Sequence, residues 1–171
     1  MMNSTNTQDA QDLHFLGQLK TIQESSKANK RKVGAIIGQA FGSWSFWNYS
    51  DNAGYNQNQL IGDCEDSDGK TFENVIHAEA AAIIEALKNI GNDNKLQLSK
   101  ATIYCTYSPC MDCCKLIVLS GIKRLVYCDE HPVNFKKSVL NGSGHYSPYD
   151  YLVNSGVEVV RVLDADIIHF K

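Results

Sequence analysis

The sequence lacks the features that place a protein in a membrane, outside the cell or on a polynucleotide. No apolar run approaches the ~20 residues that a membrane-spanning helix requires. The first residues carry neither the basic segment nor the apolar core of a signal peptide. The formal charge is −3 and the pI is near 5.9, so basic side chains are not in excess for binding a phosphate backbone. We therefore expect a cytoplasmic protein (host cytoplasm if the source is viral) that has neither a membrane nor nucleic acid as partner.

A disulfide framework is also not expected, because a reducing compartment keeps the six cysteines as thiols. Metal ligation or simple burial must then explain them. Three of the six lie in SPCMDCC, residues 108–114. A C-x-x-C pair occurs in thiol oxidoreductases, zinc knuckles and zinc enzymes, so this stretch alone leaves all three open. For four of the six thiols we favour burial as small apolar side chains: Cys64, Cys105, Cys114 and Cys128.

Length and composition are those of one ordinary globular domain. The chain has 171 residues, of which 43% are hydrophobic and 20% charged, and it shows no internal repeat or domain boundary. We expect a single domain over 1–171 with a polar tail at 1–10. Apolar spacing predicts a helix around 13–22, strands 33–38 and 43–49 paired as a hairpin, a polar loop 50–74, helix 77–91, strand 101–107, helix 109–120, strand 123–128, a second polar loop 129–148, helix 149–156 and strand 157–162.

Both chemically rich stretches are predicted at helix N-termini. We expect Ser108 to cap the helix that carries Cys110 and Cys113, whose sulfurs share one face of its first turn. His77 lies upstream, and Glu79 follows it by two positions. One imidazole and two thiolates make three zinc ligands with an open fourth position, which is the pattern of a catalytic zinc site. A zinc ion held by His77, Cys110 and Cys113 is therefore predicted.

The predicted chemistry is hydrolytic deamination. The combination H-x-E … P-C-x-x-C is the established signature of zinc-dependent nucleobase deaminases and is matched here rather than derived from spacing. Zinc lowers the pKa of its bound water; Glu79 would take the proton and deliver it to the ring nitrogen and the departing ammonia. A thioredoxin-like site gives no role to His77 or Glu79, and a four-ligand structural site lacks a further donor with suitable spacing.

Four longer stretches resemble phage-type deoxycytidylate (dCMP) deaminases of the cytidine and deoxycytidylate deaminase superfamily. They are ESSKANKRKVGAIIG, VIHAEAAAI, TIYCTYSPCMDCCKLIVLSGIKRLVYCDE and NSGVEVVRV. The resemblance implies a three-layer α/β/α sandwich with a five-stranded mixed sheet, which the alternation of strands and helices also suggests. It further implies conversion of dCMP to dUMP with release of ammonia, which supplies a thymidylate precursor.

The resemblance also implies substrate contacts. It makes Asn48, in FWNYSDNAG, the asparagine that hydrogen-bonds the deoxyribose; a plain turn asparagine is the equal alternative. It places the substrate phosphate at the basic loop, residues 27–32, which precedes the first predicted strand. A run of charged residues is, however, more often a solvated surface. The predicted substrate-binding residues are Asn48, Ala78, Ser108, Lys27, Lys30 and Arg31.

Family members are typically hexamers that dCTP activates with Mg²⁺ and dTTP inhibits, so a homo-oligomer with such effectors is implied. Tyr49 and Gly54 would belong to the effector site, although Tyr49 replaces the usual glycine and restricts the backbone. The apolar Leu116, Ile117 and Leu119 serve either the core, which is the default, or a subunit contact. Four acidic residues of the 50–74 loop would repel a triphosphate unless Mg²⁺ intervenes or they face solvent: Asp63, Glu65, Asp66 and Asp68.

Three alternatives stay open at this point. The substrate could be another free cytosine compound, such as dCTP, deoxycytidine or the base, because a nucleoside deaminase needs no phosphate site. A nucleic-acid base deaminase is opposed by the acidic charge balance. A non-catalytic zinc or redox module is opposed by Glu79, because a purely structural site has no use for a carboxylate beside an open position.

Overall fold

The computed structural model describes residues 4–41, 45–46, 52–90, 96–130, 135–136 and 146–163. Its centre is a five-stranded sheet in the order β4-β1-β5-β6-β7. The strands are β1 (Gly34–Gly38), β4 (Ala53–Tyr55), β5 (Thr102–Tyr107), β6 (Arg124–Asp129) and β7 (Glu158–Arg161), and the helices are α1 (Ser4–Glu24), α2 (Ala78–Asn89), α3 (Met111–Ser120) and α4 (Pro148–Asn154). A short ribbon of β2 (Ala40–Phe41) and β3 (Ser45–Phe46) and the 3₁₀ turn Leu98–Lys100 complete the described elements.

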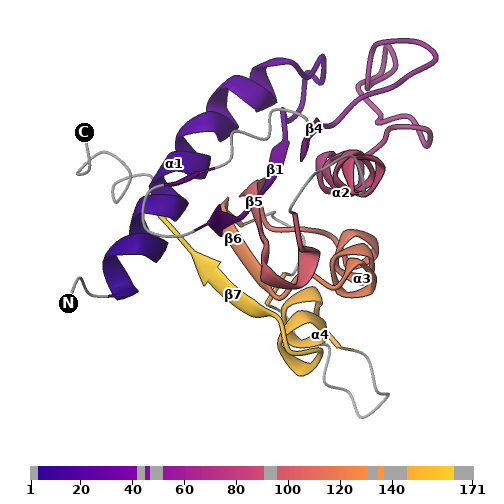
Figure 1. The fold of residues 1–171 in the computed structure, drawn as a ribbon. Helices are drawn as coiled ribbons and strands as arrows, with labels where there is room; N and C mark the ends of the chain where they lie inside the picture. Colours follow the sequence, from indigo (N-terminus) through magenta and orange to yellow (C-terminus); the bar gives the residue numbers. More distant parts are fainter. Residues whose placement is uncertain are drawn as a thin grey trace.

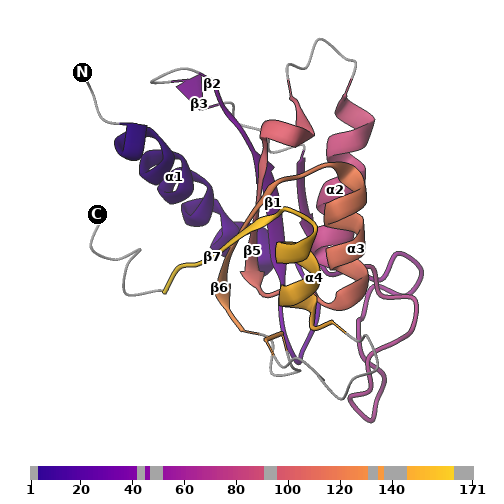
Figure 2. The same cartoon turned by 90° about the horizontal axis from the view of Figure 1, so that it is seen from below.

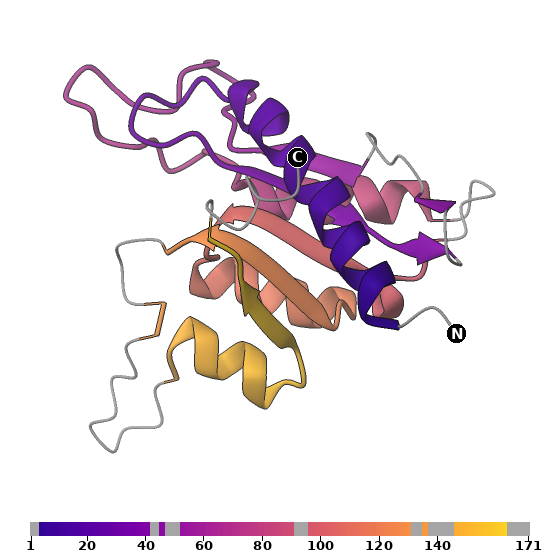
Figure 3. The same ribbon diagram turned by 90° about the vertical axis from the view of Figure 1, so that its left-hand side faces the viewer.

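Helices cover both faces of this sheet. Figure 1 shows α1 on one side and α2, α3 and α4 on the other, and Figure 3 shows α1 crossing in front of the strands with the other helices behind them. On the α1 side, Phe15, Leu16 and Leu19 pack against Ile36, Tyr104 and Val126. A larger core on the other side joins the sheet to α2, α3 and α4. The predicted three-layer α/β/α sandwich is therefore confirmed.

The sheet is mixed, as predicted. β1 runs antiparallel to both β4 and β5, whereas β5, β6 and β7 are parallel to one another. Helices α2 and α3 lie side by side and α4 lies beside α3 (Figures 1 and 2). Parallel strands need such crossover helices, and the nearly continuous burial of β5 and β6 follows from coverage on both faces.

The predicted hairpin between 33–38 and 43–49 is wrong. β1 pairs instead with β4, with Gly34 opposite Tyr55 and Ile36 opposite Ala53, and β4 lies inside the segment predicted as a loop. The aromatic residues of 43–49 favoured that stretch as a strand, but β-propensity depends on what the strand packs against. Ala53–Tyr55 is the segment that fits beneath α2.

Three helix boundaries also differ from the sequence predictions. α1 begins at Ser4, so most of the predicted polar tail is helical. His77 is the N-cap of α2 and Cys110 is the N-cap of α3, and neither side chain makes a capping hydrogen bond to its own helix. Ser108 therefore does not cap α3, because the helix begins at Met111. Gly121, at φ 86°, ends α3 in the left-handed conformation that glycine accepts.

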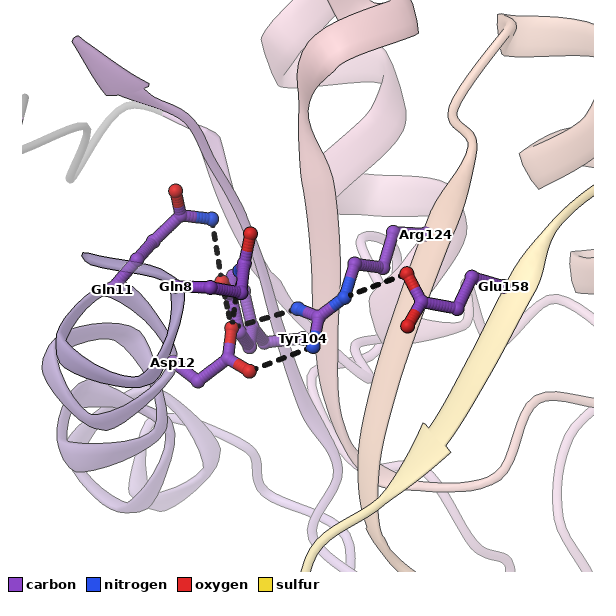
Figure 4. A network of polar contacts seen from close by, with 6 residues as sticks. All are labelled: Gln8, Gln11, Asp12, Tyr104, Arg124 and Glu158. Carbon is purple, nitrogen blue, oxygen red and sulfur yellow. Dashed lines mark hydrogen bonds and ion pairs between the residues drawn. The ribbon is translucent and has the colours of Figure 1, made fainter. Parts of the chain in front are cut away.

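A polar network ties α1 to the sheet (Figure 4). The guanidinium of Arg124 on β6 donates to both carboxylate oxygens of Asp12, at 2.7 and 2.8 Å. The hydroxyl of Tyr104 on β5 also donates to Asp12, at 2.8 Å, while Gln11 donates to that hydroxyl at 2.7 Å. The Nε of Arg124 reaches Glu158 on β7 at 3.1 Å. α1 is thus bonded to β5 and β6, and Arg124 extends the network from β6 to β7.

Candidate metal centre and its cleft

The structure brings the three predicted metal ligands together. The Nδ1 atom of His77 lies 3.5 Å from the sulfur of Cys110 and 3.5 Å from that of Cys113. All three donor atoms lie within 4.8 Å of one another. One nitrogen and two sulfurs form a donor set that zinc prefers, and three protein donors leave a coordination position open. The residues present therefore fit a zinc ion of the catalytic type.

Two adjacent helix N-termini create this cluster. His77 and Cys110 are the N-caps of α2 and α3, and Cys113 lies in the first turn of α3. The first N–H groups of each helix have no partner within the helix, so both helices direct the positive ends of their dipoles toward the site. This arrangement stabilises thiolates, which are the form of cysteine that binds zinc.

The ionisation of the cluster follows from its hydrogen bonds. The pKa of Cys110 is lowered to about 4, chiefly by its hydrogen bond with the thiol of Cys113 and also by that with His77, while burial opposes both effects. The same bond raises the pKa of Cys113. The pKa of His77 is raised, chiefly by its bond to Cys110. Charge on sulfur is thus favoured at the position where a cation would bind.

Glu79 lies buried at the same place. Its side chain belongs to the first turn of α2, and the residue is 5% exposed. Burial raises the pKa of its carboxyl above the ordinary value, while its own backbone N–H and the charge of His77 lower it. A buried carboxylate beside a metal cluster can exchange a proton with a reacting group. Among the described residues, the group of possible metal donors contains His77, Cys110 and Cys113 and does not include Glu79.

A cleft of about 400 Å³ opens at the cluster. His77, Glu79 and Cys110 line it together with four of the six residues predicted to bind substrate, namely Lys30, Arg31, Ala78 and Ser108. Ser108 is buried, and its backbone N–H donates to the carbonyl of Asp129 at 2.8 Å. Lys27 is not among the residues that line the cleft.

Arg31 is held in this cleft by two kinds of contact. Its guanidinium carbon lies 4.9 Å from the ring centroid of Tyr107, at the end of β5, a cation–π geometry. Its carbonyl accepts a hydrogen bond of 2.9 Å from the side-chain amide of Asn56. The amide oxygen of Asn56 accepts in turn from the N–H of Val33 at 2.8 Å. The main chain of the basic loop is thereby joined to the end of β4.

Asn56 is a cleft residue that the sequence analysis missed. It follows β4 directly, so the signal that would have identified it is the correct pairing of β1 with Ala53–Tyr55. Asn48 and Tyr49 lie outside the described residues. Gly54 lies on β4, where an added Cβ would overlap main-chain atoms of Ala78 and Ala82. Close packing against α2 accounts for that glycine, and its role in effector binding stays a prediction.

The remaining cysteines are explained by burial. All four are free thiols and all are buried, which confirms the interpretation from the sequence. Burial raises the pKa of Cys105 and of Cys114, so these thiols stay neutral and behave as small apolar groups. The sulfur of Cys114, which follows Cys113 in the chain, contacts the carbonyl of Pro109 at 3.8 Å.

The comparisons with known proteins agree with this geometry. The model of the "cytidine and deoxycytidylate deaminase zinc-binding region" matches residues 9–129. The chain belongs to this family of zinc-binding deaminase domains.

Two curated relatives are deoxycytidylate deaminases. That of Enterobacteria phage T2 is 41% identical over 90 residues, which cover 53% of this chain and 40% of the relative. This chain therefore matches about two fifths of that relative's length. That of Mycobacterium phage D29 is 30% identical over 128 residues, which cover 70% of this chain and 94% of the relative.

A solved structure supports the fold. The dCMP deaminase of cyanophage S-TIM5, in complex with dCMP and dUMP, superimposes with a TM-score of 0.66 at 24% identity and covers 95% of this chain and 100% of its own. Among the described residues, no helix combines the length and apolar character that crossing a bilayer requires.

Proposed function

We propose that this protein hydrolyses dCMP to dUMP with release of ammonia. The observation that carries the proposal is one cleft that holds a His–Cys–Cys zinc-type cluster, a buried carboxylate and two cationic side chains, those of Lys30 and Arg31. The cluster and Glu79 suit deamination of a cytosine ring, and the cations suit a phosphate monoester. The deoxycytidylate deaminases among the relatives support the same substrate.

The residues of the chain divide the work. His77, Cys110 and Cys113 would hold zinc, which when bound supplies the Lewis-acid chemistry that activates water at neutral pH. Glu79 accepts one proton of the attacking water and passes it to the ring nitrogen. It then takes the proton of the hydroxyl that has been added to the ring carbon and passes it to the amino group, which leaves as ammonia while the carbonyl forms. Burial of Glu79 excludes bulk water from this proton path.

The rest of the cleft would bind the nucleotide. Its volume of about 400 Å³ falls in the range of small-molecule sites. Lys30 and Arg31 pair with the phosphate, and the stacking of Arg31 on Tyr107 holds the guanidinium in place. Ala78 and Ser108 contact the base. Asn56, which lines the cleft, takes the deoxyribose role that the sequence resemblance gave to Asn48, because its amide retains an N–H and a lone pair beyond the two bonds described.

Assembly and regulation belong to this proposal as well. We infer a cytoplasmic homo-oligomer, a hexamer, that dCTP activates with Mg²⁺ and dTTP inhibits. Exposed apolar side chains on the adjacent helices α2 and α3 support subunit contacts. They include Leu116 at 38% and Leu119 at 82% exposure, whereas Ile117 is fully buried in the core.

Ammonia release from a panel of cytosine compounds tests the proposed substrate. Purified protein is assayed with dCMP, dCTP, deoxycytidine, cytosine and a cytosine-containing single-stranded oligonucleotide at equal concentrations. We expect the highest kcat/KM with dCMP. Equal activity on deoxycytidine and dCMP would contradict the phosphate site, activity confined to the oligonucleotide would favour a nucleic-acid deaminase, and inactivity of the zinc-loaded protein on every compound would favour a non-catalytic module.

A further inference from the structure

A buried acidic side chain is hydrogen-bonded to the main chain of the basic loop. The carboxylate of Glu65 accepts a hydrogen bond of 2.8 Å from the backbone N–H of Asn29 and one of 3.3 Å from that of Lys30. Glu65 is 8% exposed and lines the same cleft as Lys30 and Arg31. Both hydrogen bonds of Glu65 go to main-chain N–H groups, so they set the position of the loop. The ammonium group of Lys30 and the guanidinium group of Arg31 take no part in these two bonds.

Glu65 is itself held by an ordered turn. Its backbone forms a bridge with Thr71, and the N–H of Phe72 donates to the carbonyl of Cys64 at 3.0 Å. Asp66 closes the turn between them, because its carboxylate accepts from the N–H groups of Asp68 and Lys70 at 3.0 and 2.8 Å. Glu65 therefore lies on a short hairpin, residues 64–72, whose two arms are hydrogen-bonded to each other and whose turn is hydrogen-bonded to Asp66.

The other acidic residues of this segment behave differently. Asp63 and Asp68 are exposed, and Asp66 serves its own turn. Among the four acidic residues, Glu65 is the one whose side chain is hydrogen-bonded to the basic loop. One residue after Lys30, the side-chain amide of Asn56 donates to the carbonyl of Arg31. The segment that carries Lys30 and Arg31 is therefore fixed by hydrogen bonds to Glu65 at its start and to Asn56 at its end.

We propose that Glu65 is a positioning residue for substrate selection: it fixes the main chain at Asn29–Lys30 so that Lys30 and Arg31 meet the phosphate of a nucleoside monophosphate. This inference rests on the proposed function. Each of the two hydrogen bonds has a charged acceptor, the stronger class of hydrogen bond. Without them, the loop samples more conformations, and phosphate binding must first order it.

The predicted effect is confined to compounds that carry a phosphate. We expect Glu65→Ala to raise KM for dCMP about tenfold, the factor that corresponds to loss of a charge-assisted hydrogen bond. KM for deoxycytidine, kcat on dCMP and zinc content should stay at the parent values, because Glu65 touches neither the zinc ligands nor Glu79. Glu65→Gln keeps the shape and one acceptor, so its KM for dCMP should lie between those of the alanine variant and the parent.

Steady-state kinetics with dCMP and deoxycytidine, zinc analysis and thermal melting test the inference on the full chain. Asp68→Asn is the matched control, since it removes one negative charge from the same hairpin without touching the basic loop; it should behave like the parent. A KM for dCMP that stays at the parent value in both Glu65 variants would overturn the inference. A rise in KM that is equal for the two compounds would also overturn it, because it would mean a general loss of cleft structure.

The parent protein separates this inference from the function on which it rests. A parent without preference for dCMP over deoxycytidine contradicts the proposed phosphate site, and the role of Glu65 falls with it. A parent that prefers dCMP, and whose preference survives Glu65→Ala, contradicts the role of Glu65 alone. If the alanine variant melts below the assay temperature, the comparison is made with Glu65→Gln.

Discussion

Glu79 differs from other acidic residues of its helix in its surroundings. It is buried beside His77 and Cys113, whereas Glu85, on the same helix, pairs with Lys88 at the surface. Burial raises the pKa of Glu79 and brings its carboxyl closer to the proton affinity that an acid–base residue needs. The same residue type is therefore buried beside the metal-type cluster at one position and solvated six residues later on the same helix.

The role of Glu79 predicts a separation between zinc binding and turnover. Glu79→Gln should retain the metal and the fold yet lose activity by about a thousandfold, since the amide cannot shuttle a proton. Zinc analysis beside kcat measurements checks this, and Glu85→Gln on the same helix should change neither. A Glu79→Gln variant with activity near the parent's would remove the residue from the mechanism.

Cys110, the N-cap of α3, and Cys114, one helical turn later, are predicted to affect bound zinc differently. Cys110→Ala removes one of three ligands and should reduce bound zinc strongly, whereas Cys114→Ala alters a buried thiol that contacts Pro109 and should leave zinc in place. Because a ligand that binds only the native state stabilises it, chelation should lower the Tm of the parent more than that of Cys110→Ala. Equal zinc contents in the two variants would contradict the ligand assignment.

At the scale of elements, the contact between β4 and α2 positions the site. Gly54 leaves no room for a side chain under the first turns of the helix that carries His77 and Glu79. Gly54→Ala must therefore displace α2, and we expect a loss of about 2 kcal/mol of unfolding free energy, as for overpacked cores, together with reduced kcat. Chemical denaturation and activity measurements check both effects.

Gly17 provides the control for that substitution. It lies within α1, where an added Cβ has no neighbour within 4 Å. Gly17→Ala should stabilise the protein by up to about 1 kcal/mol, because alanine is the better helix former. If both alanine variants were equally stable, the close approach of β4 and α2 would not limit the fold.

The Asp12 network makes a prediction about the junction between α1 and the sheet. Its pair with Arg124 is mostly buried, with side-chain exposures of 13% and 15%. Removing Asp12 leaves the guanidinium and the hydroxyl of Tyr104 without this acceptor, so Asp12→Ala should cost about 3 kcal/mol. Glu85→Ala, which breaks an exposed pair with Lys88, should cost less than about 0.5 kcal/mol. Urea denaturation of both variants compares them, and similar losses would contradict a special role for the network.

At the scale of the whole molecule, one helical layer carries exposed apolar side chains. Leu87 on α2 and Leu119 on α3 are 45% and 82% exposed, and the two helices pack against each other. If this layer forms subunit contacts, Leu87→Glu with Leu119→Glu should lower the molar mass in solution while circular dichroism stays unchanged. Light scattering with and without dCTP and Mg²⁺ measures this, and a monomeric parent would remove the proposed oligomer without affecting the zinc site.

The sequence by itself identified the residues of the metal-type cluster and most of the elements. His77 with Glu79, and Cys110 with Cys113, are close neighbours in the chain, so the first turns of two helices suffice to place each pair. The apolar spacing of α2, α3 and the parallel strands is equally local, since period and burial repeat within a few residues. Local spacing places the members of each pair, whereas the meeting of the two pairs was expected from the matched deaminase motif and is made by the packing of α2 against α3.

Tertiary structure decided the partner of β1 and, with it, the rest of the cleft. Ala53–Tyr55 pairs with β1 because it fits beneath α2, although the 43–49 stretch has the stronger β-propensity. Asn56 reaches the cleft as a result, and the carboxylate of Glu65 meets N–H groups 35 and 36 positions away in the chain. No local period encodes such contacts. They arise because the pairing of β1 with β4 brings the loop before β1 close to the loop after β4.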